Sequence, residues 1–132
     1  MGMTDSEMDA HDRLTGIIAT LANLTSTNVV LVGDIMMDRY IHGFADNLNT
    51  RAPVPVLKET RREEAVGAAA HVARGLVSLG LNPCLFGVVG DDGAGVSVLE
   101  YLSEEGVNTD TISIVEGRTT TVKTRLLATR QN

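Results

Sequence analysis

The apolar positions of the chain fall into two patterns, one with helical spacing and one made of short strand-like runs. Helical spacing covers His11–Leu24 and returns at Gly67–Leu79 and Ala94–Glu105. Short runs rich in β-branched and apolar residues predict strands between and after these segments. The expected strands are Asn28–Val32, Arg39–Gly43, Val54–Lys58, Cys84–Val89, Thr111–Val115 and Thr119–Ala128. From the first strand onward strand and helix alternate, an order that is typical of an α/β fold with a mainly parallel sheet.

The first strand and the segment after it set the expected organisation. The run Asn28–Val32 is apolar without alternation, which favours a strand buried on both faces. Residues 39–60 leave the alternating order, and Pro53 and Pro55 cannot donate to a central ladder. We expect them to form a small β lid at the carboxyl end of the first strand, where ligands of open α/β sheets bind. Residues 1–27 are then an N-terminal helical extension, and residues 28–132 are one α/β unit.

Charge and composition exclude several classes of function. The 132-residue chain has a formal net charge of −6, which argues against a protein that must neutralise nucleic-acid phosphates. Its single cysteine, Cys84, excludes an internal disulfide and fits a reducing cytoplasm. Its longest apolar runs are far shorter than the roughly 20 residues of a membrane helix. We therefore expect a cytoplasmic protein with neither nucleic acid nor membrane as a partner.

Two aspartates follow the first strand, at Asp34 and Asp38. Four residues separate them by about 13 Å in extended chain and by about 6 Å in a helix, so separate roles are expected rather than a paired carboxylate dyad. A carboxylate at this edge accepts hydrogen bonds from the hydroxyl groups of a polyol such as a sugar. The alternative for either aspartate is to cap a turn.

The helix that starts at Gly67 opens with almost no side chains, since alanines occupy positions 68–70. Such a start lets a ligand approach the backbone N–H groups at Gly67 and Ala68, and the alternative is close packing against the sheet. His71 in the same turn either faces that ligand or packs in the core. No other histidine has metal-ligand spacing with it, and no metal site is predicted.

The last predicted strand carries two cations on one face. A two-residue period places Thr121, Lys123 and Arg125 together, which indicates an anion site for a group such as phosphate. The alternative is a solvated cationic strand face. Residues 87–95 match neither of the glycine-rich phosphate motifs, and Asp92 is expected only to cap a helix. The charged run at 61–64 is expected to be solvated surface.

Taken together, these motifs resemble the ribokinase-like (phosphofructokinase B type) carbohydrate kinases, over about residues 28–132. Within that family the chain is most similar to the kinase domain of D-glycero-D-manno-heptose-7-phosphate kinase/ADP-heptose synthase enzymes. The order and spacing of six motifs carry the resemblance. They are residues 30–40 (VLVGDIMMDRY), residues 51–56 (RAPVPV), the Gly67 helix start, Leu79-Gly80, residues 88–92 (VVGDD) and residues 119–125 (TTTVKTR).

The resemblance implies a three-layer fold, a mainly parallel sheet with helices on both faces, plus the small β lid. It implies that Asp38 holds sugar hydroxyls, that Gly67, Ala68 and His71 line the sugar pocket, and that Lys123 and Arg125 lie near the phosphate of the substrate. The implied reaction transfers the γ-phosphoryl group of ATP, with Mg²⁺, to the C1 hydroxyl of heptose 7-phosphate, in the synthesis of ADP-heptose, a lipopolysaccharide precursor. In such kinases the lid often mediates the contact between the two subunits of a homodimer.

The chain departs from the family pattern in two places. The family usually has Gly-Gly-Ala-Ala-Asn where this chain has Gly67-Ala68-Ala69-Ala70-His71, which leaves the identity of the sugar open. Its catalytic base lies in a Gly-Ala-Gly-Asp motif, expected beyond Asn132 together with the ATP pocket. We therefore expect a fold that is incomplete at the C-terminus and a chain that alone binds no cofactor and is inactive. The alternatives are a related kinase for another sugar and a non-catalytic sugar-binding protein that lacks the ATP half.

Overall fold

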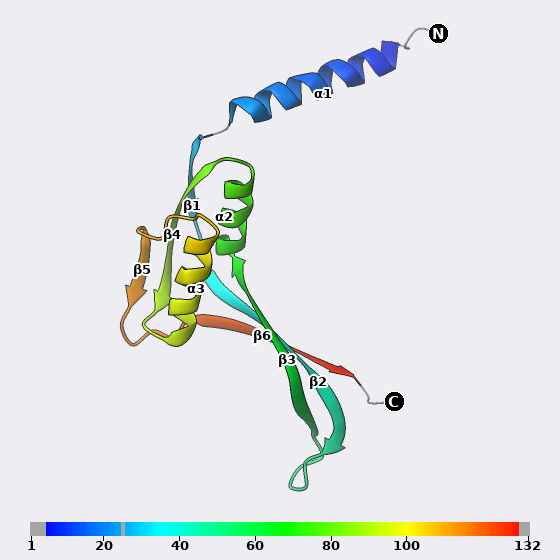
Figure 1. Cartoon of the computed structure of the whole chain (residues 1–132), viewed down its shortest axis with the longest axis vertical. Helices are drawn as coiled ribbons and strands as arrows, with labels where there is room; N and C mark the ends of the chain where they lie inside the picture. The colour runs from blue at the N-terminus through cyan, green and yellow to red at the C-terminus, as the bar shows by residue number, and fades with distance from the viewer. Residues whose placement is uncertain (1–4, 25, 130–132) are drawn as a thin grey trace.

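The computed structural model describes residues 5–24 and 26–129 (Figure 1). Residues 1–4 and 25 of the predicted N-terminal extension, and residues 130–132, lie outside the described part. The elements in chain order are α1 (Asp5–Asn23), β1 (Asn28–Val32), β2 (Ile35–Leu48), β3 (Pro55–Ala68), α2 (Ala69–Ser78), β4 (Asn82–Gly90), α3 (Gly93–Glu104), β5 (Ile112–Val115) and β6 (Thr121–Thr129).

The strands of the described residues form two three-stranded sheets. The first has the order β1-β4-β5, and both of its pairings are parallel. The second has the order β3-β2-β6, in which β2 pairs antiparallel with β3 and parallel with β6. The predicted α/β fold with mainly parallel pairing is confirmed. Figure 1 shows the second sheet extending away from the first as a long arm.

The hydrophobic core lies between the first sheet and the two helices α2 and α3. Both helices contact β4, and they also pack on the start of the second sheet through β2 and β3. The buried side chains of this core are Ile35, Met37, Val66, Ala70, Ala73, Leu85, Val89, Val98, Leu102, Val107 and Ile112. The core therefore fixes the root of the long arm against the helices.

The opposite face of the first sheet is exposed in the described residues. Val30 and Val32 of β1 are 70% and 75% exposed, and Phe86 and Val88 of β4 lie on the same face and are exposed as well. The prediction that β1 is buried on both faces is therefore wrong for this structure, because its apolar run meets helices on one side alone. The expected fold has helices on both faces of the sheet. In the described residues the first sheet is covered on one face, by α2 and α3.

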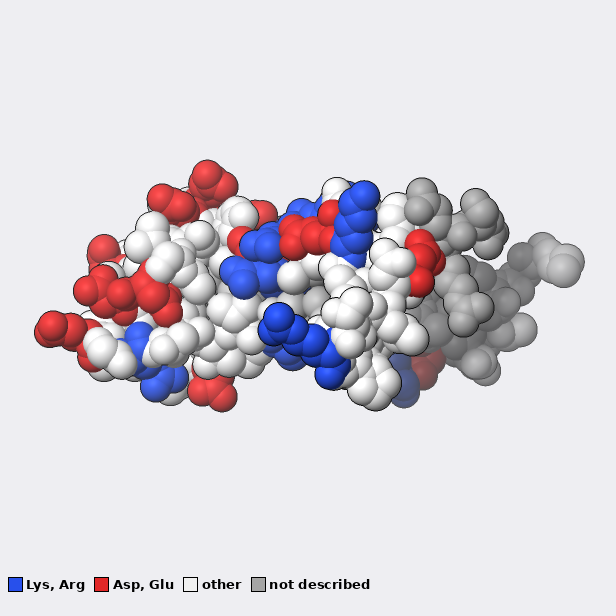
Figure 2. Space-filling model, turned by 90° about the horizontal axis from the view of Figure 1, so that it is seen from below, with Lys and Arg blue, Asp and Glu red and all other residues white. Residues whose placement is uncertain are grey.

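The hairpin formed by β2 and β3 is longer than the sequence predicts. The short strand predicted at Arg39–Gly43 lies within β2, and the one predicted at Val54–Lys58 lies within β3 from Pro55 onward; both strands have 14 residues. The charged run at 61–64 was expected to be surface, and its first three residues are exposed. Its side chains form ion pairs with neighbouring residues of the hairpin, Arg62 with Glu59 and Glu64 with Arg39. Figure 2 shows this interleaving of cationic and acidic groups across the middle of the molecule.

The predicted N-terminal helix is confirmed, and it begins earlier than His11, at Asp5. Its apolar side chains, among them Ile17 and Ile18, are exposed, and Figure 1 shows the helix projecting from the rest of the chain. None of the described helices is both long enough and apolar enough to span a lipid bilayer.

Both core helices end at a glycine. Gly80 and Gly106 have φ values of 78° and 77°, which only glycine adopts without strain. After α2 the N–H of Gly80 donates to the carbonyl of Val77, and the N–H of Leu81 donates to the carbonyl of Leu76. This double hydrogen bond is the Schellman motif, and it turns the chain sharply into β4.

Candidate functional site

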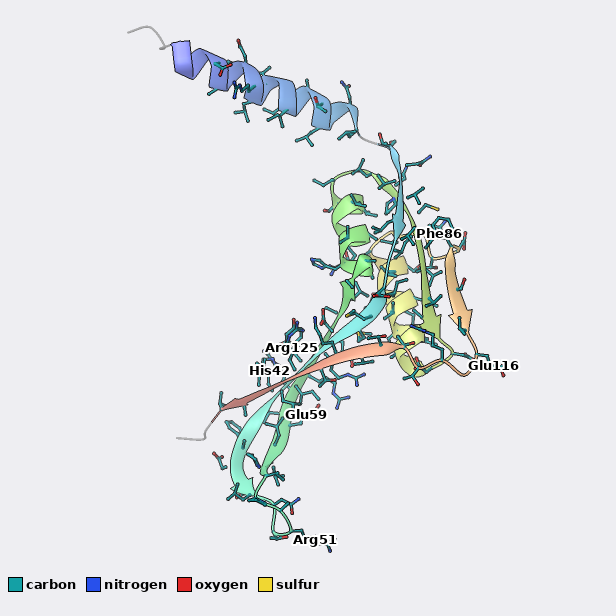
Figure 3. All side chains as sticks on the ribbon, turned by 180° about the vertical axis from the view of Figure 1, so that it is seen from behind. His42, Arg51, Glu59, Phe86, Glu116 and Arg125 are labelled. Carbon is teal, nitrogen blue, oxygen red and sulfur yellow. The ribbon has the colours of Figure 1, made fainter. Side chains whose placement is uncertain are left out.

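The residues predicted to bind a ligand lie on one face of the second sheet. Parallel pairing of β2 with β6 places Asp38 opposite Lys123 and Tyr40 opposite Arg125. Because side chains alternate along a strand, all four point to the same face. Figure 3 shows Arg125 on β6 where this strand crosses the hairpin. Lys123 and Arg125, which the two-residue period places on one face of β6, therefore lie beside Asp38, which precedes them by 85 and 87 residues in the chain.

Asp38 holds both cations through one oxygen. Its Oδ1 accepts a hydrogen bond from Nη1 of Arg125 at 2.8 Å and lies 3.2 Å from Nζ of Lys123. Burial alone would raise the pKa of the Asp38 carboxyl, but the hydrogen bonds and charges of Arg125 and Lys123 outweigh it, so the pKa lies below its ordinary value. Asp38 is thus an ionised acceptor at neutral pH, with its side chain 18% exposed.

The second oxygen of Asp38 faces the end of β3. Gly67 pairs with Met36, and a Cβ built on Gly67 would lie 2.6 Å from Oδ2 of Asp38. The glycine is therefore required for the carboxylate to lie against the strand. Immediately afterwards α2 begins at Ala69 without a side-chain cap, while the N–H of Ala69 donates to the carbonyl of Asp34.

A cavity of about 410 Å³ brings these groups together. Its lining comprises Asp38, Tyr40, Ala65, Val66, Gly67, Ala68, His71 and Arg74. Four of the six predicted site residues thus line one cavity, and Lys123 and Arg125 are joined to it through Asp38. His71 is exposed at its wall rather than packed in the core. Asp34 lies elsewhere, in a cavity beside Phe86 and Thr111, in agreement with separate roles for the two aspartates.

Ala68 occupies a backbone conformation that suits glycine. Its φ is 51° and its ψ is −128°, a backbone region that residues other than glycine rarely adopt. This is the position where the family pattern has a second glycine, and the strain gives a physical reason for that glycine.

We expect Ala68→Gly to stabilise the folded chain by about 1 kcal/mol. Relief of backbone strain, on the order of 1–3 kcal/mol, outweighs the greater freedom of glycine in the unfolded chain. Urea unfolding measures the change, with Ala94→Gly in the first turn of α3 as the control. The control should lose stability, since glycine disfavours a helix, and a loss of stability in Ala68→Gly would contradict the assignment of strain.

Asp92 supports the start of β6 as well as capping α3. Its Oδ1 accepts from the N–H of Gly95, as predicted for a cap, and its Oδ2 accepts from the N–H of Thr120, both at 2.8 Å. The hydroxyl of Thr120, which is buried, accepts from the N–H of Gly90. This network anchors the segment that leads into Lys123 and Arg125.

The stabilisation from Asp92 should disappear in acid. Its hydrogen bonds from Thr120, followed by that from Gly95, lower the pKa of the Asp92 carboxyl below its ordinary value. A carboxyl group whose pKa is lower in the folded chain than in the unfolded chain stabilises the fold. This stabilisation is fully present above the pKa of the unfolded chain, about 3.9, and is lost as the pH falls through the pKa of the folded chain. We expect urea midpoints of the wild type and Asp92→Asn to differ at pH 7 and to converge below about pH 4. A constant difference from pH 7 to pH 3 would contradict this role.

Sequence reasoning missed two polar residues of the cavity, Tyr40 and Arg74. Tyr40 was detectable, because it lies two residues after Asp38 on the same strand face. Arg74 lies one helical turn after His71 and donates from Nη2 to Glu105, the residue that follows α3, at 2.8 Å. Its Nε is buried without a hydrogen-bond partner.

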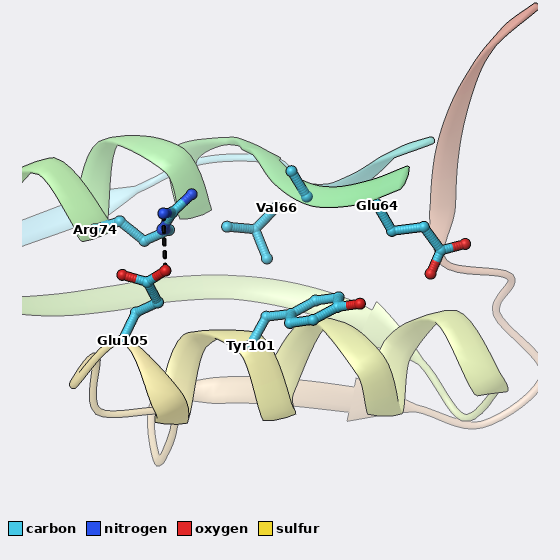
Figure 4. Close-up of a pocket in the computed structure, with 6 residues that line it drawn as sticks. Glu64, Val66, Arg74, Tyr101 and Glu105 are labelled. Carbon is cyan, nitrogen blue, oxygen red and sulfur yellow. Dashed lines mark hydrogen bonds and ion pairs between the residues drawn. The ribbon is translucent and has the colours of Figure 1, made fainter. Parts of the chain in front are cut away.

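Arg74 also lines a second cavity between the two helices and β3. This cavity has a volume of about 260 Å³ and is lined by Glu64, Ala65, Val66, Arg74, Tyr101 and Glu105 (Figure 4). The Arg74–Glu105 ion pair ties α2 to the end of α3. Among residues 5–24 and 26–129, no group of three or more His, Cys, Asp or Glu side chains is placed to hold a metal ion.

Known proteins similar to this chain are sugar kinases. D-beta-D-heptose 7-phosphate kinase of Bordetella bronchiseptica is 44% identical over 108 residues, which cover 82% of this chain and 34% of the relative. The bifunctional protein HldE of Hyphomonas neptunium is 40% identical over 116 residues, 88% of this chain and 23% of the relative. The chain thus spans about a third or less of the length of these two curated relatives.

The fold is similar to that of solved ribokinases. The structure of Arabidopsis thaliana ribokinase complexed with ribose and ATP has a TM-score of 0.63 at 20% identity, over 77% of this chain and 32% of that one. This likeness establishes the ribokinase-like fold. The described residues form a part of that fold. The pfkB family of carbohydrate kinases matches residues 26–132. The chain therefore belongs to the pfkB carbohydrate kinase family.

Proposed function

We propose that this chain carries the substrate-binding part of an ATP-dependent sugar-phosphate kinase, and that the sugar is heptose 7-phosphate. The observation that carries the proposal is the carboxylate of Asp38, which lies at a cavity wall while it holds Lys123 and Arg125. A carboxylate accepts hydrogen bonds from sugar hydroxyls, and paired cations bind a phosphate monoester. The names of the relatives, heptose 7-phosphate kinase and HldE, support the choice of sugar.

The residues of the chain would bind and orient the sugar. Oδ2 of Asp38 accepts from a ring hydroxyl, while the backbone at Gly67 and Ala68 allows the sugar to lie close to β3. A cation of β6 beside Asp38 holds the phosphate away from the reacting end. In the intact parent enzyme the hydroxyl at C1 would receive the γ-phosphoryl group of ATP. A substrate that carries a charged phosphate group and a reaction that uses ATP are both consistent with a cytoplasmic enzyme.

Binding of ATP and Mg²⁺ is not assigned to the described residues. Mg²⁺ bound to a nucleotide is usually held by one or two carboxylates and by phosphate oxygens. We propose that the chain alone binds the sugar without turnover. We also propose that a homodimer, where formed, uses the hairpin of β2 and β3.

Isothermal titration of the 132-residue chain with heptose 7-phosphate tests the proposal, with fructose 6-phosphate as the competing sugar. We expect saturable binding that prefers the heptose and weakens about tenfold in Lys123→Ala, since one charge-assisted hydrogen bond is lost. Arg13→Ala on the projecting helix α1 also removes one exposed cation; it is the control and should bind like the wild type. A folded chain that binds neither sugar would refute the assignment.

A second candidate is a kinase for another phosphorylated sugar. His71 favours it, because this side chain is exposed at the cavity wall, where the family pattern has an asparagine. Preference for fructose 6-phosphate in the same titration would select this candidate.

A further inference from the structure

The two cations on Asp38 are held very differently. Nη1 of Arg125 donates both to Oδ1 of Asp38 at 2.8 Å and to the hydroxyl of Tyr40 at 3.1 Å. The guanidinium also lies over the ring of Tyr40, with Cζ 4.9 Å from the ring centroid, which is a cation–π geometry. Among the described residues Lys123 has one ion pair, at 3.2 Å, and its side chain is 51% exposed, whereas that of Arg125 is 40% exposed.

Moving Lys123 away from Asp38 therefore costs much less than moving Arg125. An exposed lysine pair contributes little net free energy, because the flexible side chain loses entropy and solvent screens the charges. Arg125 would give up a short charge-assisted hydrogen bond, a second hydrogen bond and its contact with the aromatic ring. The geometry thus distinguishes a fixed cation from one that is able to move.

We propose that Tyr40 is a positioning residue that holds Arg125 on Asp38, and that Lys123 is the cation that moves onto the phosphate of the sugar. The part that concerns Lys123 rests on the proposed function, whereas the part that concerns Tyr40 does not. With Arg125 fixed, Asp38 keeps one positive partner after Lys123 leaves. Its carboxylate therefore stays ionised and able to accept from sugar hydroxyls while phosphate is bound.

The surroundings of Asp38 contain other titratable groups. His71 of α2 lines the same cavity, and Glu63 of β3 pairs with Tyr40 across the hairpin while it binds Arg61. None of these contacts replaces the hydroxyl and ring of Tyr40 at Arg125. Loss of Tyr40 should therefore be felt first at Arg125 and Asp38.

Nuclear magnetic resonance of the ligand-free chain tests the role of Tyr40. In Tyr40→Leu we expect the Nη–H protons of Arg125, whose Nη1 donates to Asp38 and Tyr40, to exchange with water at least fivefold faster than in the wild type. We expect the pKa of Asp38, followed through its carboxyl carbon, to rise toward its ordinary value. Tyr40→Phe keeps the ring and should lie between the two. Tyr101→Leu, at an exposed tyrosine of α3, is the matched control and should change neither quantity.

Two results of that experiment would overturn the proposal. One is an Arg125 exchange rate and an Asp38 pKa that are the same in Tyr40→Leu and in the wild type, in a variant whose circular dichroism is unchanged. The other is a Lys123 side chain as rigid as that of Arg125, measured by relaxation of its Cε methylene group. Neither measurement requires a ligand.

Titration with heptose 7-phosphate and with unphosphorylated heptose separates the two cations. Lys123→Met should lower the affinity for the phosphorylated sugar about tenfold and leave the affinity for heptose unchanged. Arg125→Met should lower both, because Asp38 loses its fixed partner. The reverse assignment of these effects would refute the division of roles. A wild-type chain that binds neither sugar would refute the proposed function and the phosphate role of Lys123, while the measurements on the free chain would still decide the role of Tyr40.

Discussion

Asp38→Asn should lower the affinity of the chain for heptose 7-phosphate by about 100-fold. The amide is isosteric but neutral, so the hydrogen bonds it accepts from sugar hydroxyls are weaker than those of a carboxylate. Each hydrogen bond to a charged group contributes about 1.5–3 kcal/mol, and 1.4 kcal/mol corresponds to a factor of ten. The substitution also leaves Arg125 and Lys123 side by side without the anion that both of them contact.

Calorimetric titration with heptose 7-phosphate measures this loss. Asp12→Asn on α1 is the matched control, because this aspartate is exposed on the projecting helix, away from the cavity. It removes the same charge and should bind like the wild type. An affinity of Asp38→Asn within twofold of the wild-type value would exclude the carboxylate as a sugar ligand.

Strand periodicity predicted which candidate residues share a strand face, but it did not predict what they contact. A two-residue period is enough to place Lys123 and Arg125 on one face of β6. Their contact with Asp38 depends on the parallel pairing of β2 with β6, and residues so far apart in sequence leave no local signal of that pairing. The sequence therefore indicated two separate candidate sites, an aspartate for a sugar and a pair of cations for an anion. In the folded chain Asp38 contacts both Lys123 and Arg125.

Errors in the predicted elements have a similar cause. The continuous apolar run of β1 is a local property, whereas its burial depends on which elements cover the sheet, and Val30 and Val32 remain exposed in the described structure. The hairpin strands were predicted too short because the charged run at 61–64 was assigned only to solvated surface, although its residues belong to a strand. Those residues instead pair within the hairpin, as Arg39 does with Glu64, and extend both strands.

Asp92 illustrates what a correct local prediction leaves out. Its position before a helix was enough to predict the cap, and the cap is present. Its second hydrogen bond, to the N–H of Thr120, spans 28 residues and ties α3 to the start of β6. A residue assigned to helix termination thereby supports the strand that carries the cations.

Gly95→Ala should destabilise the chain by about 3 kcal/mol, through overpacking at this junction. A Cβ on Gly95, which is buried, would overlap the carbonyl oxygen of Gly90 and lie 2.9 Å from Oγ1 of Thr120. Neither neighbour has room to move, because the N–H of Gly90 and the hydroxyl of Thr120 are hydrogen-bonded to each other. Since domains of this size have net stabilities of only about 5–15 kcal/mol, the loss should be evident in the urea midpoint.

Gly93→Ala provides a control with the same chemical change two residues away. A Cβ on Gly93 meets nothing within 4 Å, and alanine favours a helix over glycine by up to about 1 kcal/mol, so this variant should be at least as stable as the wild type. Because the strained junction leads directly into β6, Gly95→Ala should also weaken binding of heptose 7-phosphate under conditions where the chain is still folded. Equal urea midpoints for the two variants would mean that the junction yields to an added methyl group, and that the position of Lys123 and Arg125 does not depend on it.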